Sequence, residues 1–324
     1  MSDAAKLLLR FLDRENAATK FHYSEALKDY AEFVRASNVE KAIERLLARD
    51  HTAANESVTR WKRSMIGTRD RKGKLVAGRG LSTSTVNLRL TVLRGIIRKA
   101  FRRGVIAWEL DVSSVPNEHV HDVRGPGIDA LKKILDIAEA EPGPAGKRNY
   151  AIIRVFGETG LRRNELAKLD LNDVEIGASP ALWIQGKGRR QKERVGISKK
   201  CARAIGDWLM VRPLAPTIAL FTNLIPGRYG RISPTAVYDL VVALGKKARI
   251  RKVRGKNKVH PDALRHTVFT EAGREVNRTG RGVETLMKFT RHKDARVAQG
   301  YLDAADDAAA SIAAAVASRL DRAS

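Results

Sequence analysis

The stretch TGLRRNEL, residues 159–166, decides how the rest of this 324-residue chain is interpreted. Arg162 and Glu165 stand three residues apart, on one face of the helix predicted there. Four later positions complete a set with Arg162: Lys187 in GKGRRQKER, Arg265 in DALRH, His292 in TRHKD, and Tyr301. A lone tyrosine or arginine would carry no information. The order and the spacing of these five residues indicate a single site.

Together these side chains suit an attack on a phosphodiester that needs no metal. Tyr301 is the one potential nucleophile, and its attack would form a covalent phosphotyrosine that preserves the bond energy for rejoining. A phenol has a pKa near ~10, so roughly one in a thousand is ionised at neutral pH, and nearby cations favour the ionised form. Guanidinium groups match the geometry of phosphate oxygens and stay charged. Fixed positive charge is usually the largest catalytic contribution where negative charge develops.

The net charge points to a polyanionic partner. Lysines and arginines number 61 against 36 acidic residues, which gives a formal charge of +25 and a pI near 10.5. This charge clusters beside the motifs, and counterion release strengthens the binding of such a protein to nucleic acid. The sequence therefore predicts double-stranded DNA as the partner.

The single cysteine, Cys201, leaves no intrachain disulfide and no cysteine-rich zinc site, which fits a reducing cytosol. No apolar run reaches the ~18 residues that span a membrane, and the N-terminus is typical of an amphipathic helix rather than a signal peptide. The GKG of residues 186–188 lacks the flanking residues of an ATP-binding loop. We expect a cytoplasmic protein with no membrane partner, no metal and no cofactor.

The first part of the chain, up to residue 115, is predicted to be helical. A short helix opens it around residues 7–12, residues 24–49 form a stretch broken at Ser37-Asn38, and residues 53–66 form a further helix. Residues 67–81 hold four glycines and five basic residues. They are predicted to be a flexible loop, either a solvated connection or a phosphate contact.

The clearest helix lies in STSTVNLRLTVLRGIIRKAFRRGVI, residues 82–106. Ser82 or Thr83 can cap its start, and Gly104 ends it. Its predicted apolar face consists of Val86, Leu90, Leu93, Ile97, Ala100 and Phe101. The remaining surface carries six cations and no acid. The candidates for DNA contact on it are Arg89, Arg94 and Arg98.

Residues 116–127, PNEHVHDVRGPG, are predicted to link two domains. Helices follow at 129–140 and 147–157. Two β-prone runs, Leu182–Gln185 and Arg194–Ile197, then flank a basic turn, which is typical of a β-hairpin. Helices continue from there to the C-terminus. The predicted fold class is mainly α, in two domains, with a small antiparallel β-sheet in the second.

These motifs make the chain resemble the tyrosine recombinases of the phage-integrase family. The resemblance rests on TGLRRNEL, on LRH with His292 following 27 residues after Arg265, and on the nine residues from His292 to Tyr301. It covers roughly residues 125–320, and residues 82–106 are similar to the family's core-binding domain. It implies a helical core-binding domain at 1–115, a linker at 116–127 and a catalytic domain with a C-terminal helix at 128–324.

The resemblance implies a site-specific recombinase or integrase that cleaves and rejoins DNA through a 3′-phosphotyrosyl intermediate. Arg162 and Arg265 would clamp the phosphate, His292 would hydrogen-bond to it, and Lys187 would protonate the leaving 5′ oxygen. Four protomers would hold two duplexes and exchange strands, with accessory DNA-bending proteins as further partners. Glu165 would orient an arginine, as the matching acidic residue does in the family.

Two positions leave alternatives open. Lys192 competes with Lys187 as the general acid in the hairpin turn. The family usually has histidine three residues before its second arginine, where this chain has Asp262. Asp262 would accept the proton of Tyr301, orient Arg265, or cap a helix that starts at Ala263, and His260 is the alternative for the missing histidine.

Further phosphate contacts are expected from the basic segments around these motifs. The predicted DNA-binding residues there are Arg189, Arg190, Lys256, Lys258 and Arg291. Arg291 is a second departure, because many family members have a small glycine turn before the histidine. The C-terminal alanine-rich segment carries Ile312, Val316 and Leu320 as an apolar stripe. The stripe packs either on its own protomer or, as the resemblance favours, on a neighbouring one.

Three other functions use overlapping features. A type IB topoisomerase runs the same chemistry on one duplex, and a DNA-binding protein that has lost catalysis would explain Asp262. A metal-dependent nuclease is more distant, because the matched motifs contain no acidic metal cluster. Covalent adduct formation and supercoil relaxation separate these from a recombinase.

Overall fold

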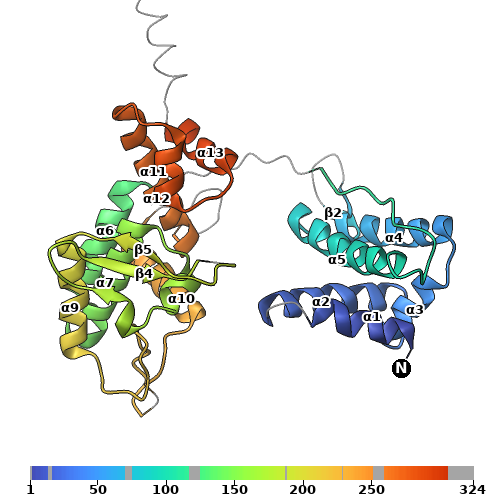
Figure 1. The fold of residues 1–324 in the computed structure, drawn as a ribbon, viewed down its shortest axis with the longest axis horizontal. Coiled ribbons are helices and arrows are strands. Elements are labelled where there is room, and N and C mark those ends of the chain that lie inside the picture. Colours follow the sequence, from blue (N-terminus) through green and yellow to red (C-terminus); the bar gives the residue numbers. More distant parts are fainter. Residues whose placement is uncertain are drawn as a thin grey trace, which may run out of the picture. The chain divides into compact units, whose positions relative to one another are not determined.

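The computed structural model describes residues 2–13, 17–69, 75–116, 125–186, 188–227, 229–250 and 259–305. The chain divides into two compact units, Met1–Val120 and His121–Ser324. Both are mainly helical, and each contains one small antiparallel sheet (Figure 1). Among the described residues, no helix combines the length and the apolar character needed to cross a bilayer.

The first unit is a bundle of helices around a buried aromatic pair. Its elements are α1 (Asp3–Leu12), α2 (Ala17–Phe33), α3 (Val39–Leu47), α4 (His51–Ile66), β1 (Thr68–Arg69), β2 (Leu75–Ala77) and α5 (Thr83–Phe101). Helix α5 packs against α1, α2 and α4. The rings of Tyr30 and Trp61 meet edge to face in this core, with centroids 5.1 Å apart.

Local signals explain where these helices begin. The predicted break at Ser37-Asn38 is confirmed, since Oδ1 of Asn38 accepts a hydrogen bond from the Lys41 backbone N–H at 2.8 Å and caps α3. Ser82 caps α5 in the same way, through Thr85 at 3.2 Å.

Two expectations for this unit were wrong. Phe101, the last residue of α5, is 41% exposed, whereas its neighbour Ala100 is fully buried, so Phe101 does not share the buried face. Part of the expected loop at 67–81 forms a hairpin in which Thr68 pairs with Ala77. Strands of two or three residues are too short to show a period in the sequence.

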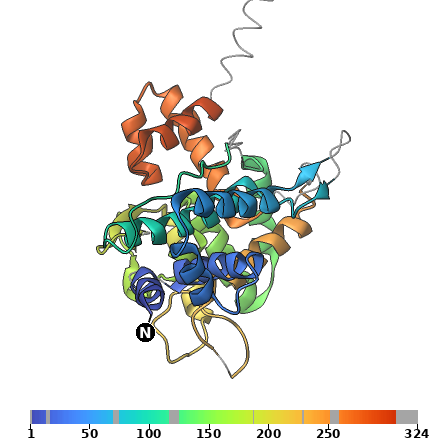
Figure 2. The ribbon, with the colours of Figure 1, turned by 90° about the vertical axis from the view of Figure 1, so that its right-hand side faces the viewer.

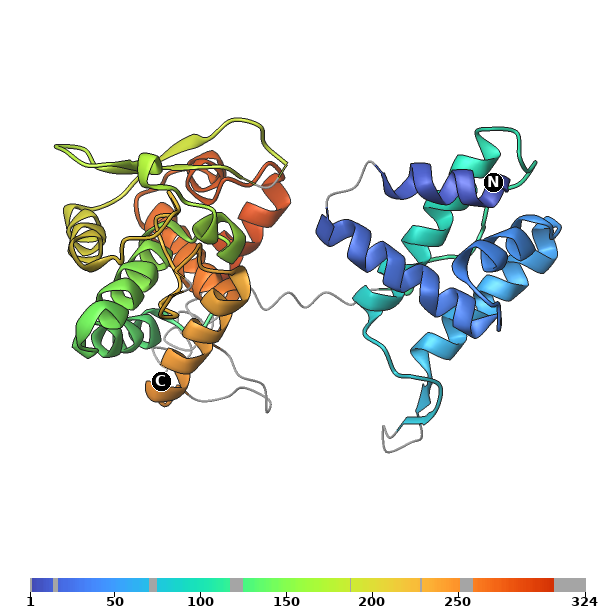
Figure 3. The same ribbon diagram turned by 90° about the horizontal axis from the view of Figure 1, so that it is seen from below.

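The second unit surrounds a buried helix, α11. Its elements are α6 (Ile128–Ala140), α7 (Gly143–Thr159), α8 (Arg163–Ala167), η1 (Leu171–Asp173), β3 (Val174–Glu175), β4 (Ala181–Ile184), β5 (Glu193–Gly196), α9 (Lys199–Val211), α10 (Pro234–Lys247), α11 (Pro261–Arg278), α12 (Val283–Thr290) and α13 (Ala295–Ala305). The strand order is β3-β4-β5, and Leu182 pairs with Val195 across the predicted hairpin. Figure 3 shows this sheet along one edge of the unit. The hairpin prediction is confirmed to within one residue, whereas β3 was not predicted.

Helix α11 brings distant segments together. It packs against α7, α12 and α13, and the last two lie beside it in Figures 1 and 2. Gly160 ends α7 with φ +57°, and a Cβ there would lie 2.4 Å from the ring of Phe269 in α11. Only glycine permits both that backbone and that approach. A Cβ on Gly273 would similarly lie 2.8 Å from the backbone oxygen of Tyr301, so α11 and α13 are in close contact at this point.

Candidate active site

Four of the five predicted residues come together in the second unit. Arg162 precedes α8, Arg265 lies in α11, His292 follows α12 and Tyr301 lies in α13. Nη2 of Arg265 is 3.3 Å from Nε2 of His292. The rings of His292 and Tyr301 are parallel, with centroids 6.0 Å apart. The fifth residue, Lys187, lies outside the described residues.

Arg265 is held rigidly inside the unit. It is 5% exposed, and its guanidinium donates to the backbone oxygens of Gly160 and of Thr290, the latter at 3.3 Å. It also lies over the ring of Phe269, 4.2 Å from the centroid. Burial, and next the charge of Arg162, lower the pKa of Arg265 to about 10. The group therefore stays cationic at neutral pH, in a position fixed by α7 and α12.

Glu165 organises the arginines of this cluster. Its carboxylate is 5% exposed and accepts hydrogen bonds from the Arg162 backbone N–H at 2.9 Å and from the Arg162 guanidinium at 3.1 Å. It also accepts one from Arg291 at 3.1 Å. Burial alone would raise the pKa of Glu165, but the charge of Arg291 and the bonds to Arg162 outweigh it and lower that pKa. The carboxylate is ionised at neutral pH.

Arg291 lies inside the protein. Its side chain is 7% exposed, and besides Glu165 it faces Glu193 of β5, with Nη1 3.6 Å from Oε1. The sequence suggested that Arg291 contacts a DNA phosphate, but this placement makes it an internal partner of two carboxylates. Its backbone is left-handed, with φ +60°, as expected where relatives have glycine.

His292 is a neutral imidazole. Arginine has no acceptor, so Nε2 must accept from Arg265 and the proton is on Nδ1. Burial, followed by the charges of Arg265, Arg162 and Arg291, lowers the pKa of His292 to about 4. Among the described residues, Nδ1 is buried and has no hydrogen-bond partner.

Tyr301 is 3% exposed, and its hydroxyl is 2.8 Å from Nδ1 of His266. Burial raises the pKa of Tyr301, the charges of Arg265 and Arg162 lower it, and Asp262 raises it; the net shift is upward. His266 belongs to the LRH motif, but the sequence pattern indicated no role for it. Its position directly after Arg265 was the available signal.

The start of α11 differs from the prediction. The helix begins at Pro261 rather than Ala263, and its cap is His260, whose Nδ1 accepts from the Ala263 backbone N–H at 3.2 Å. His260 is thereby committed to the helix end. Asp262 is exposed in the first turn. The hydrogen bond described for the Tyr301 hydroxyl is to His266.

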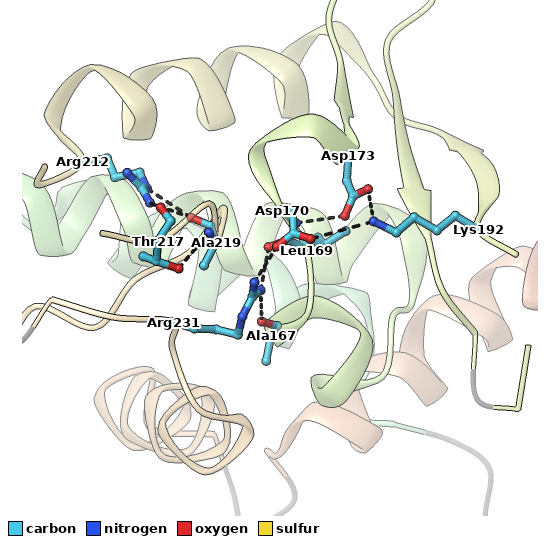
Figure 4. Close-up of polar contacts among 9 residues, drawn as sticks. All are labelled: Ala167, Leu169, Asp170, Asp173, Lys192, Arg212, Thr217, Ala219 and Arg231. Carbon is cyan, nitrogen blue, oxygen red and sulfur yellow. Dashed lines mark hydrogen bonds and ion pairs between the residues drawn. The ribbon is translucent and has the colours of Figure 1, made fainter. Parts of the chain in front are cut away.

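Lys192 is held in an ion-pair network with two carboxylates (Figure 4). Its ammonium group donates to the buried carboxylate of Asp173 and lies 3.9 Å from Asp170. Asp170 also pairs with Arg231, which donates to the backbone oxygens of Ala167, the last residue of α8, and of Leu169. Arg212 holds the neighbouring loop through the oxygen of Ala219 at 2.9 Å. The network fastens the β4–β5 hairpin to the segment that follows α8.

The predicted DNA contacts of α5 are partly used within the first unit. Arg89 pairs with the buried Asp29 at 2.6 Å, together with Arg79, and Trp61 donates to the same carboxylate at 2.7 Å. This arrangement is structural, since Arg89 is only 20% exposed.

The other side chains predicted to contact DNA differ in their exposure and in their partners within the protein. Arg94 donates to the oxygen of Val112 and to Ser114. Arg98 is exposed and 3.7 Å from Glu109. Arg190 is exposed, whereas Arg189 pairs with Glu193 of the same hairpin. The two other candidates, Lys256 and Lys258, fall outside the described residues, as does the C-terminal stripe of Ile312, Val316 and Leu320.

Within the described part of the chain, no cluster of three or more His, Cys, Asp or Glu side chains is placed to hold a metal ion. The described side chains around Tyr301 include guanidinium groups and two imidazoles.

Comparison with known proteins agrees with this geometry. The model of the phage integrase family matches residues 128–308. A tyrosine recombinase of Synechococcus elongatus is 32% identical over 271 residues, which cover 82% of this chain and 78% of the relative. A tyrosine recombinase of Synechocystis is 28% identical over 297 residues, or 90% of this chain and 88% of the relative.

Solved structures share the fold. The Tn1549 transposon integrase, in complex with transposon right end DNA, aligns with a TM-score of 0.65 and 17% identity over 98% of this chain and 99% of that one. The curated relatives are named recombinases, which does not favour the topoisomerase or the inactive DNA-binding protein. The chain belongs to the phage integrase family and is a tyrosine recombinase.

Proposed function

We propose that this recombinase cleaves and rejoins specific sites in double-stranded DNA through a covalent bond between Tyr301 and a 3′ phosphate. The observation that carries the proposal is the convergence of Tyr301, Arg265 and His292, from three separate parts of the second unit, in one cluster. A nucleophile beside fixed cations is the arrangement that phosphoryl transfer by positioning and electrostatics requires.

The reaction would run as an exchange of two phosphate esters. The Oη atom of Tyr301 attacks phosphorus, the Oη–P bond forms, and the bond from phosphorus to the 5′ oxygen breaks. Arg162 and Arg265 would bind the non-bridging oxygens. The side chain of Arg162 is 41% exposed and can reach DNA directly, while Arg265 is positioned by backbone oxygens. Rejoining reverses these steps with a 5′ hydroxyl of the partner strand, so no external energy source is needed.

His292 would donate to the phosphate. Its Nδ1–H lacks a partner among the described residues, and a buried donor without a partner costs roughly 1–3 kcal/mol. A phosphate oxygen would satisfy that donor. Because the neutral form is favoured down to a pKa of about 4, this role does not depend on protonation near neutral pH.

Lys187 is our candidate for the acid that protonates the leaving 5′ oxygen. The support is indirect: the competing Lys192 donates to Asp173, which is 5% exposed, and lies beside Asp170. These two carboxylates hold Lys192 at the segment that follows α8. The family resemblance assigns the role to Lys187.

DNA is the partner, and related solved structures contain it. The XerH recombinase, for example, is seen bound to its palindromic difH substrate, with a TM-score of 0.64 to this chain. That a homotetramer holds two duplexes, helped by accessory DNA-bending proteins, is part of the same proposal. The formal charge of +25 supports the DNA contact but not the number of protomers.

The test is a search for the covalent intermediate. The protein is mixed with nicked suicide duplexes from the DNA that flanks its own gene, and denaturing gels are examined for a protein–DNA adduct. We expect an adduct that Tyr301→Phe abolishes while DNA binding is retained. Salt-sensitive binding to the same duplexes without an adduct would contradict the proposed chemistry.

A further inference from the structure

We propose that His266 is the catalytic proton acceptor for Tyr301. The inference rests on the proposed function, and it adds a residue to it. His266 touches the reacting atom, because its Nδ1 is 2.8 Å from the hydroxyl oxygen that would attack phosphorus.

The nucleophile needs an acceptor. Tyr301 is 3% exposed, and burial keeps its pKa above the usual value despite the charges of Arg265 and Arg162. The phenol is therefore protonated in the resting site and largely shielded from solvent. A general base must lie within about 2.6–3.2 Å of the proton that it removes. His266 meets that condition.

The other candidates around the phenol are less suitable. His292 lies with its ring parallel to that of Tyr301, and its Nε2 lone pair already accepts from Arg265. Asp262 is exposed at the first turn of α11, four residues before His266, and its negative charge raises the pKa of Tyr301. Arg265 and Arg162 are cations without an acceptor.

The position of His266 is held by the fold. His266 follows Arg265 in α11, and Arg265 is anchored to the oxygens of Gly160 and Thr290. Tyr301 lies on α13, which approaches α11 so closely that a Cβ on Gly273 would come within 2.8 Å of its backbone oxygen. Two helices in such contact fix the imidazole against the hydroxyl.

The protons of the Tyr301 phenol and of the 5′ oxygen balance in both cleavage and rejoining. As Oη attacks, the O–H bond breaks and the proton moves to Nδ1 of His266, which becomes imidazolium. The 5′ oxygen leaves with a proton from Lys187. In rejoining, the 5′ hydroxyl returns its proton to Lys187 as it attacks phosphorus, and His266 returns the other proton to the departing Tyr301.

The experiment separates proton transfer from positioning. His266→Asn places an amide oxygen near the Nδ1 position, which accepts a hydrogen bond but cannot take a proton. Single-turnover adduct formation on the nicked suicide duplexes should slow by about 10²- to 10⁴-fold, the usual contribution of a general base. Affinity for the uncut duplex and melting temperature should stay near those of the wild type.

A chemically altered nucleophile provides the second arm. Fluorinated tyrosine, incorporated at position 301, has a phenol that ionises far more readily. In that background His266→Asn should cost less than about tenfold, because the proton no longer has to be removed by a side chain. Added imidazole should likewise accelerate His266→Ala. A structural role would give the same loss with either phenol and no response to imidazole.

The outcomes are distinct. If the wild type forms no adduct that depends on Tyr301, the proposed function fails and this inference with it. If the wild type forms the adduct and His266→Asn cleaves within threefold of its rate, only the role of His266 is overturned. Should His266→Asn fold poorly, the pH–rate profile of the protein with an intact His266 decides. Its acidic limb reports protonation of the base, so the limb must stay in place when the phenol is fluorinated, and a limb that moves with the phenol would overturn the role of His266.

Discussion

Nη2 of Arg291 lies 3.1 Å from Oε2 of Glu165, and the two side chains are 7% and 5% exposed. The same guanidinium faces Glu193, the first residue of β5 after the turn of the β4–β5 hairpin. Glu165 in turn holds both the backbone and the side chain of Arg162. One internal cation thus joins the hairpin that carries the general-acid candidate to the arginine that would bind the phosphate.

Removal of this cation should weaken the second unit and the site together. Arg291→Met keeps the length of the side chain and leaves Glu165 with Arg162 as its charged partner. We expect a loss of roughly 1–3 kcal/mol in the free energy of unfolding, as for a buried acceptor that loses a partner. Arg291→Gly should lose less, because glycine relieves a left-handed backbone that costs roughly 1–2 kcal/mol per non-glycine residue. Urea unfolding of the three proteins measures this order.

Equal stabilities of the three proteins would contradict this prediction. If Arg291→Gly and Arg291→Met are both as stable as the wild type, the ion pair with Glu165 contributes nothing and serves only to place Arg162. Adduct formation on the same suicide duplexes then shows whether the variants have lost the placement of Arg162.

A change of the leaving group should distinguish the roles of the two lysines of the hairpin, Lys187 and Lys192. A duplex in which sulfur replaces the bridging 5′ oxygen at the cleavage site releases a thiolate, which needs no proton. Lys187→Ala should cleave the ordinary duplex about 10²- to 10⁴-fold more slowly, as for loss of a general acid, and the sulfur duplex at close to the wild-type rate. Lys192→Ala should show no such rescue, because its partner Asp173 loses an ion pair instead. Rescue of Lys192→Ala and not of Lys187→Ala would reverse the assignment.

These residues also show what the sequence could predict. The hairpin and the helix start at Ser82 follow from local patterns, because periodicity and capping act over a few residues. The convergence of the distant motifs was expected from their order and spacing and from the family resemblance. The partners of Arg89 and Lys192 do not. Asp29 is 60 residues from Arg89, and Asp173 is 19 from Lys192, so only the folded chain shows these cations neutralised.

The role of charge is where sequence and structure differ most. A basic residue beside a motif was interpreted as a DNA contact, yet Arg291 and Arg89 are paired internally. Charge type is visible in the sequence, but exposure is decided by packing. His266 shows the opposite case. Its place in the sequence indicated no function, yet its imidazole is within hydrogen-bond distance of the Tyr301 hydroxyl.

Asp262 should hinder cleavage rather than help it. Its exposed carboxylate raises the pKa of Tyr301, after the larger effects of burial and the arginines, and it would repel a bound phosphate. Asp262→Asn removes that charge and keeps the shape. We expect tighter binding to the suicide duplex at low salt and adduct formation at least as fast as in the wild type. A large loss of adduct formation at unchanged affinity would instead identify Asp262 as the proton acceptor and remove that role from His266.

Acid should destabilise the second unit through His292. Its pKa is about 4 in the folded protein and 6.5 in a free side chain, so between these values the unfolded chain binds more protons. Stability therefore rises with pH across this window, by at most about 1.4 kcal/mol per pH unit from this group, and the contribution is complete above pH 6.5. The pKa of Glu165 is also lowered, but from 4.5, so this carboxylate acts only at more acidic pH. Urea unfolding at pH 5.0 and 6.5 should show a smaller difference for His292→Asn than for the wild type. An equal difference in the two proteins would show that the buried imidazole does not titrate in this range.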